Sequence, residues 1–390
     1  MMKTLLKDVQ LFLPDKTIDC GFLLINDGII EELGYSKDCP VIDESYKVIQ
    51  LSPDQAVIPG FIDLHIHGSS GADTMDATAE ALQTIAAAMP KEGTTSFLAT
   101  TMTTHKSDIQ KALENAASYV AQHNHPGKAE VLGIHLEGPF ISPKRIGAQH
   151  PDFVVSPSID QFKEWQRCAN GNIKLVTIAP EQPGGMELVR FLTEEGVVSS
   201  IGHSDATYEQ VVQAIEAGLS HATHLYNGMR PLHHREPGVV GAVFLHDEIK
   251  SEIIVDGVHS RPEMVRLAYR NKGKEGLILI TDAMRAQCLG NGEYDLGGQN
   301  VTVKGKSAQL ADGTLAGSIV TLQEAAKNMM DFTSCGIREI IQMASVNPAK
   351  QINVFDRKGS IEKGKDADLV IWGQDGIEMT FCRGELAYQR

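Results

Sequence analysis

The 390-residue chain has few cysteines, few positive charges for its size and no long apolar run. Its six cysteines include no Cys-x-x-Cys pair, which argues against both a disulfide framework and a thiolate metal site. Its 35 Lys and Arg residues stand against 50 Asp and Glu residues, a formal net charge of −15. This balance argues against a nucleic-acid partner and against an anionic membrane partner.

Apolar stretches stay well below the ~20 residues that cross a bilayer, and the first residues lack the apolar segment of a signal peptide. We therefore expect a cytoplasmic protein without a membrane partner. Hydrophobic residues make up 42% of the chain and charged residues 22%, which is typical of a globular protein rather than a disordered one. Histidine is the informative residue type, because fourteen imidazoles offer many candidates for a metal site or an acid–base site.

From residue 57 onward, short apolar runs alternate with helical stretches, which is the sequence form of repeated βα units around a parallel sheet. Eight such units close a (β/α)8 barrel of the TIM type. The chain ends carry strand-like segments instead, and a hairpin is expected at residues 294–304. We predict an α/β protein in which residues 58–352 form the barrel and residues 1–57 and 353–390 pair into a small β-sandwich domain. The eight runs are residues 57–64, 94–100, 131–136, 173–178, 197–201, 221–225, 252–255 and 277–281.

Polar residues gather where five of these runs end, which is where barrel enzymes build their sites. His65 and His67 share one face because strand side chains alternate with a period of two. Imidazole and carboxylate donors suit zinc, iron or a similar divalent ion, and six donors are enough for one or two ions. The candidate ligands are His65, His67, Glu137, His203, His224 and Asp282.

Each candidate also has a structural explanation. A His-x-His pair often lies on an ordinary strand, Glu137 could form a salt bridge, His203 and His224 could be core histidines, and Asp282 could cap a helix. The occurrence of all six at five strand ends favours the metal site.

Several segments of the sequence are similar to the amidohydrolase superfamily and, within it, to the family of N-acetylglucosamine-6-phosphate deacetylases. The His65-Ile66-His67 motif is shared widely in the superfamily. The Leu136-Glu137-Gly138-Pro139-Phe140 and Arg235-Glu236-Pro237-Gly238 segments are narrower and indicate the deacetylases. The resemblance implies one ion held by Glu137, His203 and His224, and a second position served by His65, His67, Glu137 and Asp282, with zinc or iron as the metal. Metal-assisted hydrolysis fits these groups, and Asp282 is the carboxylate best placed to act as its catalytic general base and then acid.

The resemblance also implies a phosphosugar substrate, N-acetyl-D-glucosamine 6-phosphate, hydrolysed to D-glucosamine 6-phosphate and acetate in amino-sugar catabolism and cell-wall recycling. Arg235, together with backbone around Asn227 and Gly228, would bind the phosphate. Arg235 would do so in the neighbouring subunit's site, which implies a homodimer. His259 would contact the sugar.

One position departs from the family pattern. Many relatives carry histidine where this chain has Gln149, and that histidine helps to orient the acetyl carbonyl. Either Gln149 or His150 would fill the role here. His135 shares a face with Glu137 and could lie near the ions or serve the core. The remaining histidines are expected to be surface or packing residues: His105, His123, His125, His221, His233 and His246.

Two other functions compete with deacetylation. An amidohydrolase of cyclic amides, similar to a dihydroorotase or a hydantoinase, usually has a bridging lysine where this chain offers Glu137. A catalytically inactive scaffold with the same fold tends to lose metal ligands, whereas this sequence keeps all six. Both comparisons favour the deacetylase.

Overall fold

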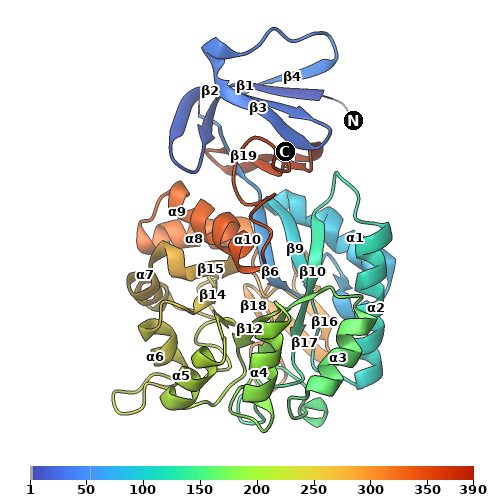
Figure 1. Cartoon of the computed structure of the whole chain (residues 1–390), viewed down its shortest axis with the longest axis vertical. Helices are drawn as coiled ribbons and strands as arrows, with labels where there is room; N and C mark the ends of the chain where they lie inside the picture. The colour runs from blue at the N-terminus through green and yellow to red at the C-terminus, as the bar shows by residue number, and fades with distance from the viewer. Residues whose placement is uncertain (1–2, 53) are drawn as a thin grey trace.

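The computed structural model describes residues 3–52 and 54–390. It contains a barrel of eight parallel strands surrounded by helices and a separate β-sheet built from both chain ends (Figure 1). This architecture confirms the predicted fold class. Among the described residues, none of the helices has the length and apolar character needed to cross a membrane.

The eight barrel strands pair in chain order, each parallel to the next. A parallel bridge between Ile66 and Ala283, just beyond the last strand, closes the ring. The strands read as continuous apolar runs because helices cover their outer faces, so both faces are buried. They are β6 (Phe61–Ile66), β9 (Thr94–Thr100), β10 (Glu130–Glu137), β11 (Ile173–Ile178), β12 (Val198–Ile201), β13 (His221–Ala222), β14 (Lys250–Ile254) and β15 (Leu277–Ile280).

The helices pack their apolar faces on the outside of these strands and form the largest core of the protein. Threonine side chains at Thr207 and Thr321 cap the starts of two of them through reciprocal capping boxes. A π-helical turn (Gln342–Val346) joins the last two. The helices are α1 (Ala79–Ala88), α2 (Lys106–Gln122), α3 (Ile159–Cys168), α4 (Gly185–Glu194), α5 (Tyr208–Glu216), α6 (Gly238–Leu245), α7 (Pro262–Gly276), α8 (Leu322–Thr333), α9 (Ile337–Ile341) and α10 (Asn347–Gln351).

Both chain ends contribute to the second sheet, as predicted. Strands β5 and β19 join the two ends by antiparallel pairing, and side chains such as Leu6, Leu369 and Phe381 share one small core. The division of the chain at residues 57 and 353 stays a prediction. The strands are β1 (Lys3–Phe12), β2 (Thr17–Asn26), β3 (Ile29–Tyr35), β4 (Tyr46–Gln50), β5 (Ala56–Pro59), β19 (Leu369–Gly373), β20 (Gly376–Cys382) and β21 (Glu385–Gln389).

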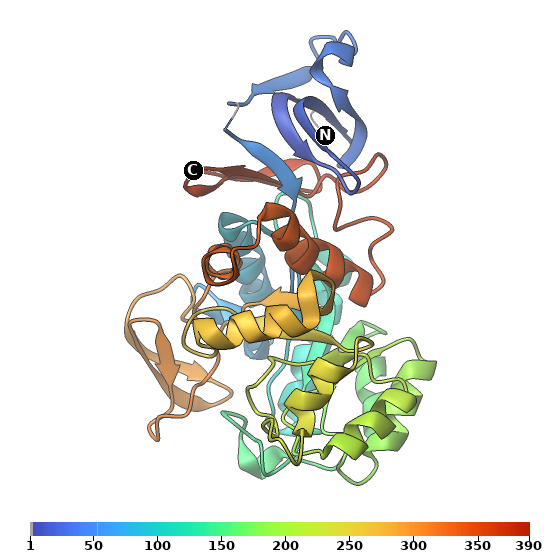
Figure 2. The same cartoon turned by 90° about the vertical axis from the view of Figure 1, so that its left-hand side faces the viewer.

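The first predicted run, residues 57–64, is two strands rather than one, because β5 belongs to the terminal sheet and β6 to the barrel. Gly60 lies between the two strands. A Cβ atom at this position would overlap the side chain of Thr95, so the position has no room for a larger residue. The terminal sheet therefore lies at the end of the barrel where β6 begins. The carboxyl ends of the barrel strands face away from it (Figures 1 and 2).

The predicted hairpin is confirmed as part of a three-stranded antiparallel insertion after β15, which projects from the side of the barrel (Figure 2). A separate short pair of strands consists of β7 (Gly68–Ser69) and β8 (Ala72–Asp73). The insertion comprises β16 (Gly292–Leu296), β17 (Gln299–Lys304) and β18 (Ser307–Gln309). Its apolar side chains form a separate core with Met102 and Met284. Leu296 of this insertion and Leu315, which follows it, reach the wall of the cavity described next.

Candidate metal centre

The structure brings all six predicted ligands together at the carboxyl ends of the barrel strands. His203, His224 and Asp282 each follow a strand and adopt positive φ angles of 46°, 33° and 50°. Residues other than glycine seldom occupy this left-handed region, and strain of this kind often marks functional sites.

Glu137, His203 and His224 form one donor group. The Oε1 atom of Glu137 lies 3.2 Å from His203 Nε2 and 3.1 Å from His224 Nε2, and the two nitrogens are 3.1 Å apart. The Nδ1 atom of His203 lies 2.8 Å from the carbonyl oxygen of Arg145. That carbonyl can only accept, so Nδ1 carries the hydrogen and the Nε2 of a neutral ring has a lone pair facing the carboxylate. A divalent ion between these atoms would satisfy all three donors at once.

His65, His67 and Asp282 form the second group. The Nε2 atoms of both histidines lie 3.3 Å from Asp282 Oδ1, and His67 Nε2 is 3.2 Å from Glu137 Oε2. His65 Nε2 is buried without a hydrogen-bond partner among the described residues. Because a buried nitrogen rarely remains unpaired, this group also fits a cation, and Glu137 lies between the two positions.

The two carboxylates are held in the ionised form that metal binding requires. Burial by itself would raise the pKa of Glu137, but without an ion the positive charge of His65 and hydrogen bonds from His203 and His224 hold that pKa well below its usual range. A bound ion would supply the positive charge in their place. Burial likewise opposes the ionisation of Asp282, yet His65 and His67 lower its pKa. Both acids are therefore negatively charged at neutral pH.

A cavity of about 220 Å³ opens beside these ligands. Gln149, Asn227, Gly228 and His259 line it together with five of the six ligands, His65 lying below the surface. The Nδ1 atom of His259 lies 2.7 Å from Asp256 Oδ2. The predicted substrate residues on this wall are thus placed around the metal ligands, although their roles remain predictions.

Gln149 and His150, the two candidates for orienting the acetyl carbonyl, lie in different places. Gln149 is buried in the cavity wall, where its Nε2 donates to Glu137 Oε2 at 2.8 Å and its Oε1 accepts from the backbone N–H of Thr103. His150 caps a short helical turn by accepting from Asp152 N, and it packs on Phe153. Only Gln149 of the pair lines the cavity.

Arg235 does not line the cavity of its own chain. It lies in an exposed loop, residues 231–235, with its Nη1 atom 2.8 Å from His234 Nε2. The next residue, Glu236, anchors this loop by accepting hydrogen bonds from the backbone N–H groups of Tyr208 and Gly238. The Arg-Glu-Pro-Gly segment therefore fixes its glutamate and presents its arginine outward.

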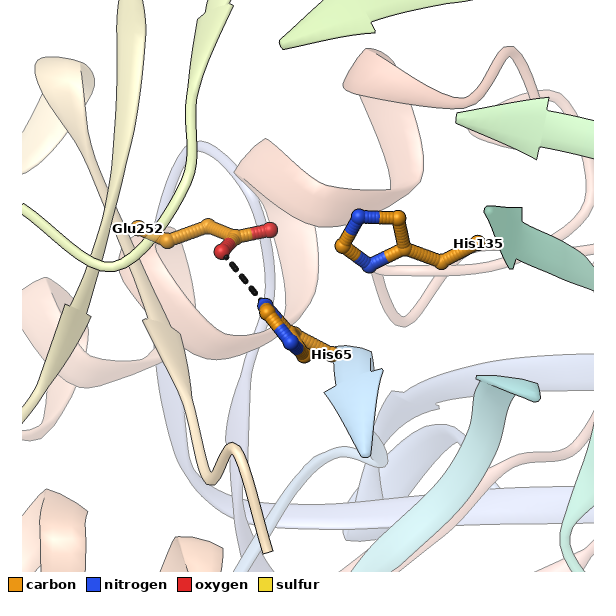
Figure 3. Close-up of side chains that lie close together, drawn as sticks. All are labelled: His65, His135 and Glu252. Carbon is orange, nitrogen blue, oxygen red and sulfur yellow. Dashed lines mark hydrogen bonds and ion pairs between the residues drawn. The ribbon is translucent and has the colours of Figure 1, made fainter. Parts of the chain in front are cut away.

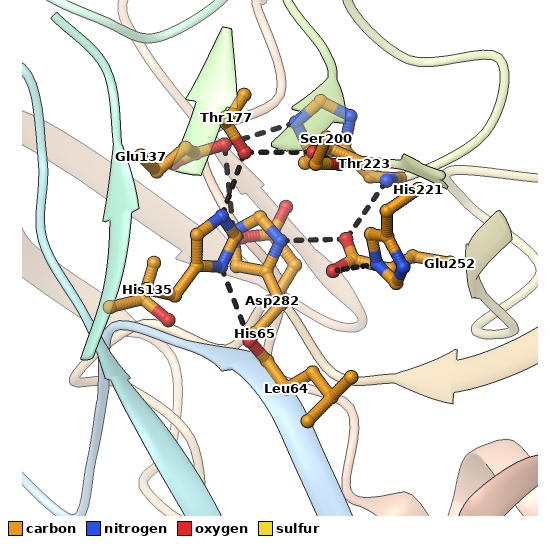
Figure 4. A network of polar contacts seen from close by, with 12 residues as sticks. Leu64, His65, His135, Glu137, Thr177, Ser200, His221, Thr223, Glu252 and Asp282 are labelled. Carbon is orange, nitrogen blue, oxygen red and sulfur yellow. Dashed lines mark hydrogen bonds and ion pairs between the residues drawn. The ribbon is translucent and has the colours of Figure 1, made fainter. Parts of the chain in front are cut away.

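The sequence prediction did not include a polar layer that fills the barrel below the ligands (Figure 4). Glu252 on β14 is fully buried there, and burial would raise its pKa, but His65 and His221 hold that pKa well below its usual range. His135 lies in the same layer, between the carbonyl oxygen of Leu64 and the hydroxyl of Thr177. One feature of the sequence could have indicated this layer: Glu252 is a charged residue at the start of a predicted strand whose two faces are both expected to be buried.

The fold and the cluster of histidines and carboxylates at the strand ends are those of a metal-dependent hydrolase. The chain belongs to the amidohydrolase family, whose sequence profile matches residues 56–387. This membership confirms the resemblance inferred from the motifs.

More specific similarity is to deacetylases of one phosphosugar. The chain is 48% identical over 387 residues to an N-acetylglucosamine-6-phosphate deacetylase of Bacillus subtilis, covering 98% of this chain and 97% of that protein. The crystal structure of an N-acetylglucosamine-6-phosphate deacetylase from Thermotoga maritima is similar with a TM-score of 0.88 and 34% identity, covering 99% of this chain and 100% of that one. A mutant deacetylase from Mycobacterium smegmatis in complex with N-acetyl-D-glucosamine-6-phosphate is similar with a TM-score of 0.91 and 29% identity, and both chains are covered completely.

Proposed function

We propose that the chain hydrolyses the N-acetyl group of N-acetyl-D-glucosamine 6-phosphate to D-glucosamine 6-phosphate and acetate, in amino-sugar catabolism and cell-wall recycling. The observation that carries the proposal is the cavity in which two donor groups and Gln149, Asn227 and His259 meet. The 48% identity to the Bacillus subtilis deacetylase over nearly the whole chain supports the choice of substrate.

One or two divalent ions, zinc or iron, would be held by the two donor groups. When bound, such an ion would polarise the acetyl carbonyl and lower the pKa of a water toward ~7. The chain's own contribution is to hold Glu137 and Asp282 ionised and to bury the four imidazoles around them.

Asp282 is proposed as the residue that moves the proton. Its side chain is 12% exposed, whereas those of the other five ligands are 7% exposed or less, so it reaches furthest into the cavity. Its ionised carboxylate would take a proton from the attacking water and pass it to the amine of the departing sugar. General acid–base transfer of this kind contributes typically 10²–10⁴-fold to the rate.

The remaining cavity residues would position the substrate. The amide of Gln149 can donate to the acetyl carbonyl without carrying a charge, and His259 would contact the sugar. The phosphate would be bound near Asn227 and Gly228 by Arg235 of the neighbouring subunit, because a guanidinium can form a bidentate contact with phosphate. The exposed loop that presents Arg235 supports a homodimer as the active form.

The decisive assay compares acetate release from N-acetylglucosamine with and without the 6-phosphate, on protein of measured metal content. We expect a strong preference for the phosphorylated sugar, lost in Arg235→Ala and kept in Arg190→Ala, an exposed arginine on α4. Equal rates on both sugars would refute the phosphate site. The 4-epimer of the substrate, tested in the same way, would show how tightly the sugar itself is selected.

Mixing two inactive variants tests the shared site. In a dimer of one Asp282→Asn chain and one Arg235→Ala chain, one of the two sites keeps both native residues if Arg235 acts across the interface. Activity that reappears on mixing supports the homodimer proposal. Mixed dimers that form but stay inactive would place Arg235 in its own chain's site.

A further inference from the structure

Glu252 is the one carboxylate among the described residues that lies directly behind a candidate metal ligand (Figure 3). It extends from β14 into the closed interior of the barrel and has no exposed surface. Its Oε2 atom lies 3.0 Å from His65 Nδ1 and accepts from the backbone N–H of His224 at 3.1 Å, and its Oε1 atom lies 3.1 Å from His221 Nε2. None of the deacetylation roles assigned above uses this residue.

The chemistry of these contacts fixes how the imidazole of His65 is protonated. An ionised carboxylate can only accept, so His65 donates from Nδ1. A neutral ring then carries its lone pair on Nε2, the atom that lies 3.3 Å from Asp282 and 3.5 Å from Glu137. Without the carboxylate, either nitrogen could carry the hydrogen and the ring could turn.

The other candidate ligands lack such a partner. The Nδ1 atom of His203 meets a neutral carbonyl oxygen, and the Nδ1 atoms of His67 and His224 have no hydrogen-bond partner among the described residues. Against the opposite side of His65, the ring of His135 packs edge-on with a centroid distance of 4.5 Å. His65 is therefore held by a charge on one nitrogen and by a packed ring beside it (Figure 4).

We propose that Glu252 is a positioning residue that presents Nε2 of His65 as a ligand and thereby sets the affinity of the ion position formed by His65, His67 and Asp282. Carboxylates behind ligating histidines make the imidazole more basic and orient it, and their loss typically costs 10–100-fold in metal affinity or activity. The inference rests on the proposed metal-dependent function and names a residue outside its ligand set.

The test is a Zn²⁺ titration of the metal-free protein against a chromophoric chelator, which gives a dissociation constant for each ion. We expect Glu252→Gln to weaken one ion by 10–100-fold and to leave the other unchanged. His67→Ala should weaken the binding of the same ion. Glu252→Asp, which keeps the negative charge, should reduce the affinity less than Glu252→Gln does. Glu92→Gln is the matched control, because Glu92 is also a buried glutamate but accepts from Leu322 N and Gln287 instead of a candidate ligand.

A second readout separates positioning from a general loss of structure. The ¹⁵N shifts of the histidine rings in the Zn²⁺-loaded protein report which nitrogen of each ring carries the hydrogen, and the signal of His65 is identified by its loss in His65→Asn. We expect Glu252→Gln to shift hydrogen from Nδ1 toward Nε2 at His65. Unchanged Zn²⁺ affinities, or equal weakening of both ions with a lower melting temperature of the metal-free protein, would overturn the proposal.

These readouts do not depend on turnover. A protein that binds Zn²⁺ as described but releases no acetate from the phosphosugar would refute the proposed function and leave the role of Glu252 intact. In a wild-type protein that binds a single ion, an unchanged affinity in Glu252→Gln would likewise overturn the role of Glu252.

Discussion

Replacing Asp282 with asparagine should remove the proton-transferring group while keeping the shape of the site. The backbone at Asp282 has φ of 50°, a left-handed conformation that asparagine and aspartate adopt more easily than other side chains. Alanine at this position would add backbone strain of roughly 1–2 kcal/mol. Asparagine is therefore the cleaner substitution for separating catalysis from folding.

The expected effect is a fall in kcat of about 10²–10⁴-fold, the usual contribution of a general acid–base residue. At about 1.4 kcal/mol for each tenfold change, this equals roughly 3–5 kcal/mol in activation free energy. The loss follows from the carboxylate lying 3.3 Å from the Nε2 atoms of His65 and His67, where its charge is held at neutral pH. KM should change much less, because no sugar-binding role is assigned to Asp282.

The assay measures acetate release under saturating phosphosugar, with metal content and the melting temperature determined on the same samples. Asp375→Asn is the matched control, because it makes the same chemical change at a residue on an exposed turn of the terminal sheet. An Asp282→Asn protein that folds, binds metal and retains more than a tenth of the wild-type kcat would refute the assignment.

Three further outcomes are expected. Chelation should lower the melting temperature and added Zn²⁺ should restore it, since ligand at 1,000 times its Kd stabilises the native state by about 4 kcal/mol; an unchanged melting temperature would contradict the metal centre. Burial opposes the ionisation of Glu130, but Lys358 and other cations lower its pKa from 4.5 to about 2. The ionised Glu130 therefore adds roughly 3 kcal/mol to the free energy of unfolding above pH 4.5, and this contribution is lost as the pH falls toward 2. The unfolding free energies of Glu130→Gln and of the wild type, measured with urea, should therefore converge near pH 2. A difference between them that stays constant with pH would contradict this account of Glu130. Gly60→Ala should cost about 1–3 kcal/mol in unfolding free energy by overlap with Thr95, whereas Gly290→Ala, which meets no atom within 4 Å, should cost far less; equal losses would refute the packing argument.

The sequence was sufficient for the barrel and for the clustering of the candidate metal ligands because both follow local rules. Each of the eight apolar runs contains a barrel strand, and the alternation of side chains placed His65 and His67 on one face. Residues at the ends of parallel strands meet at one end of a barrel whatever the loops between them. The ligand set could therefore be named before any contact was known.

Two features could be found only in the structure. One is the division between β5 and β6, and the other is the burial of Gln149 and Glu252. A run of apolar residues looks the same whether it stays in one sheet or passes into a second, so Gly60 gave no sign of the change. Gln149 and His150 are adjacent in sequence, yet only Gln149 lines the cavity, whereas His150 caps the short helical turn that follows.

The sequence alone thus determined which residues could bind metal and which family the chain resembles, because donor types and strand spacing are local properties. Tertiary structure decided which nitrogen of His65 faces Glu137 and Asp282, through a hydrogen bond to a residue 187 positions away. The same holds for the contact between Gln149 and Glu137. Hydrogen bonds between distant residues exist only once the barrel closes, and no pattern in the chain records them.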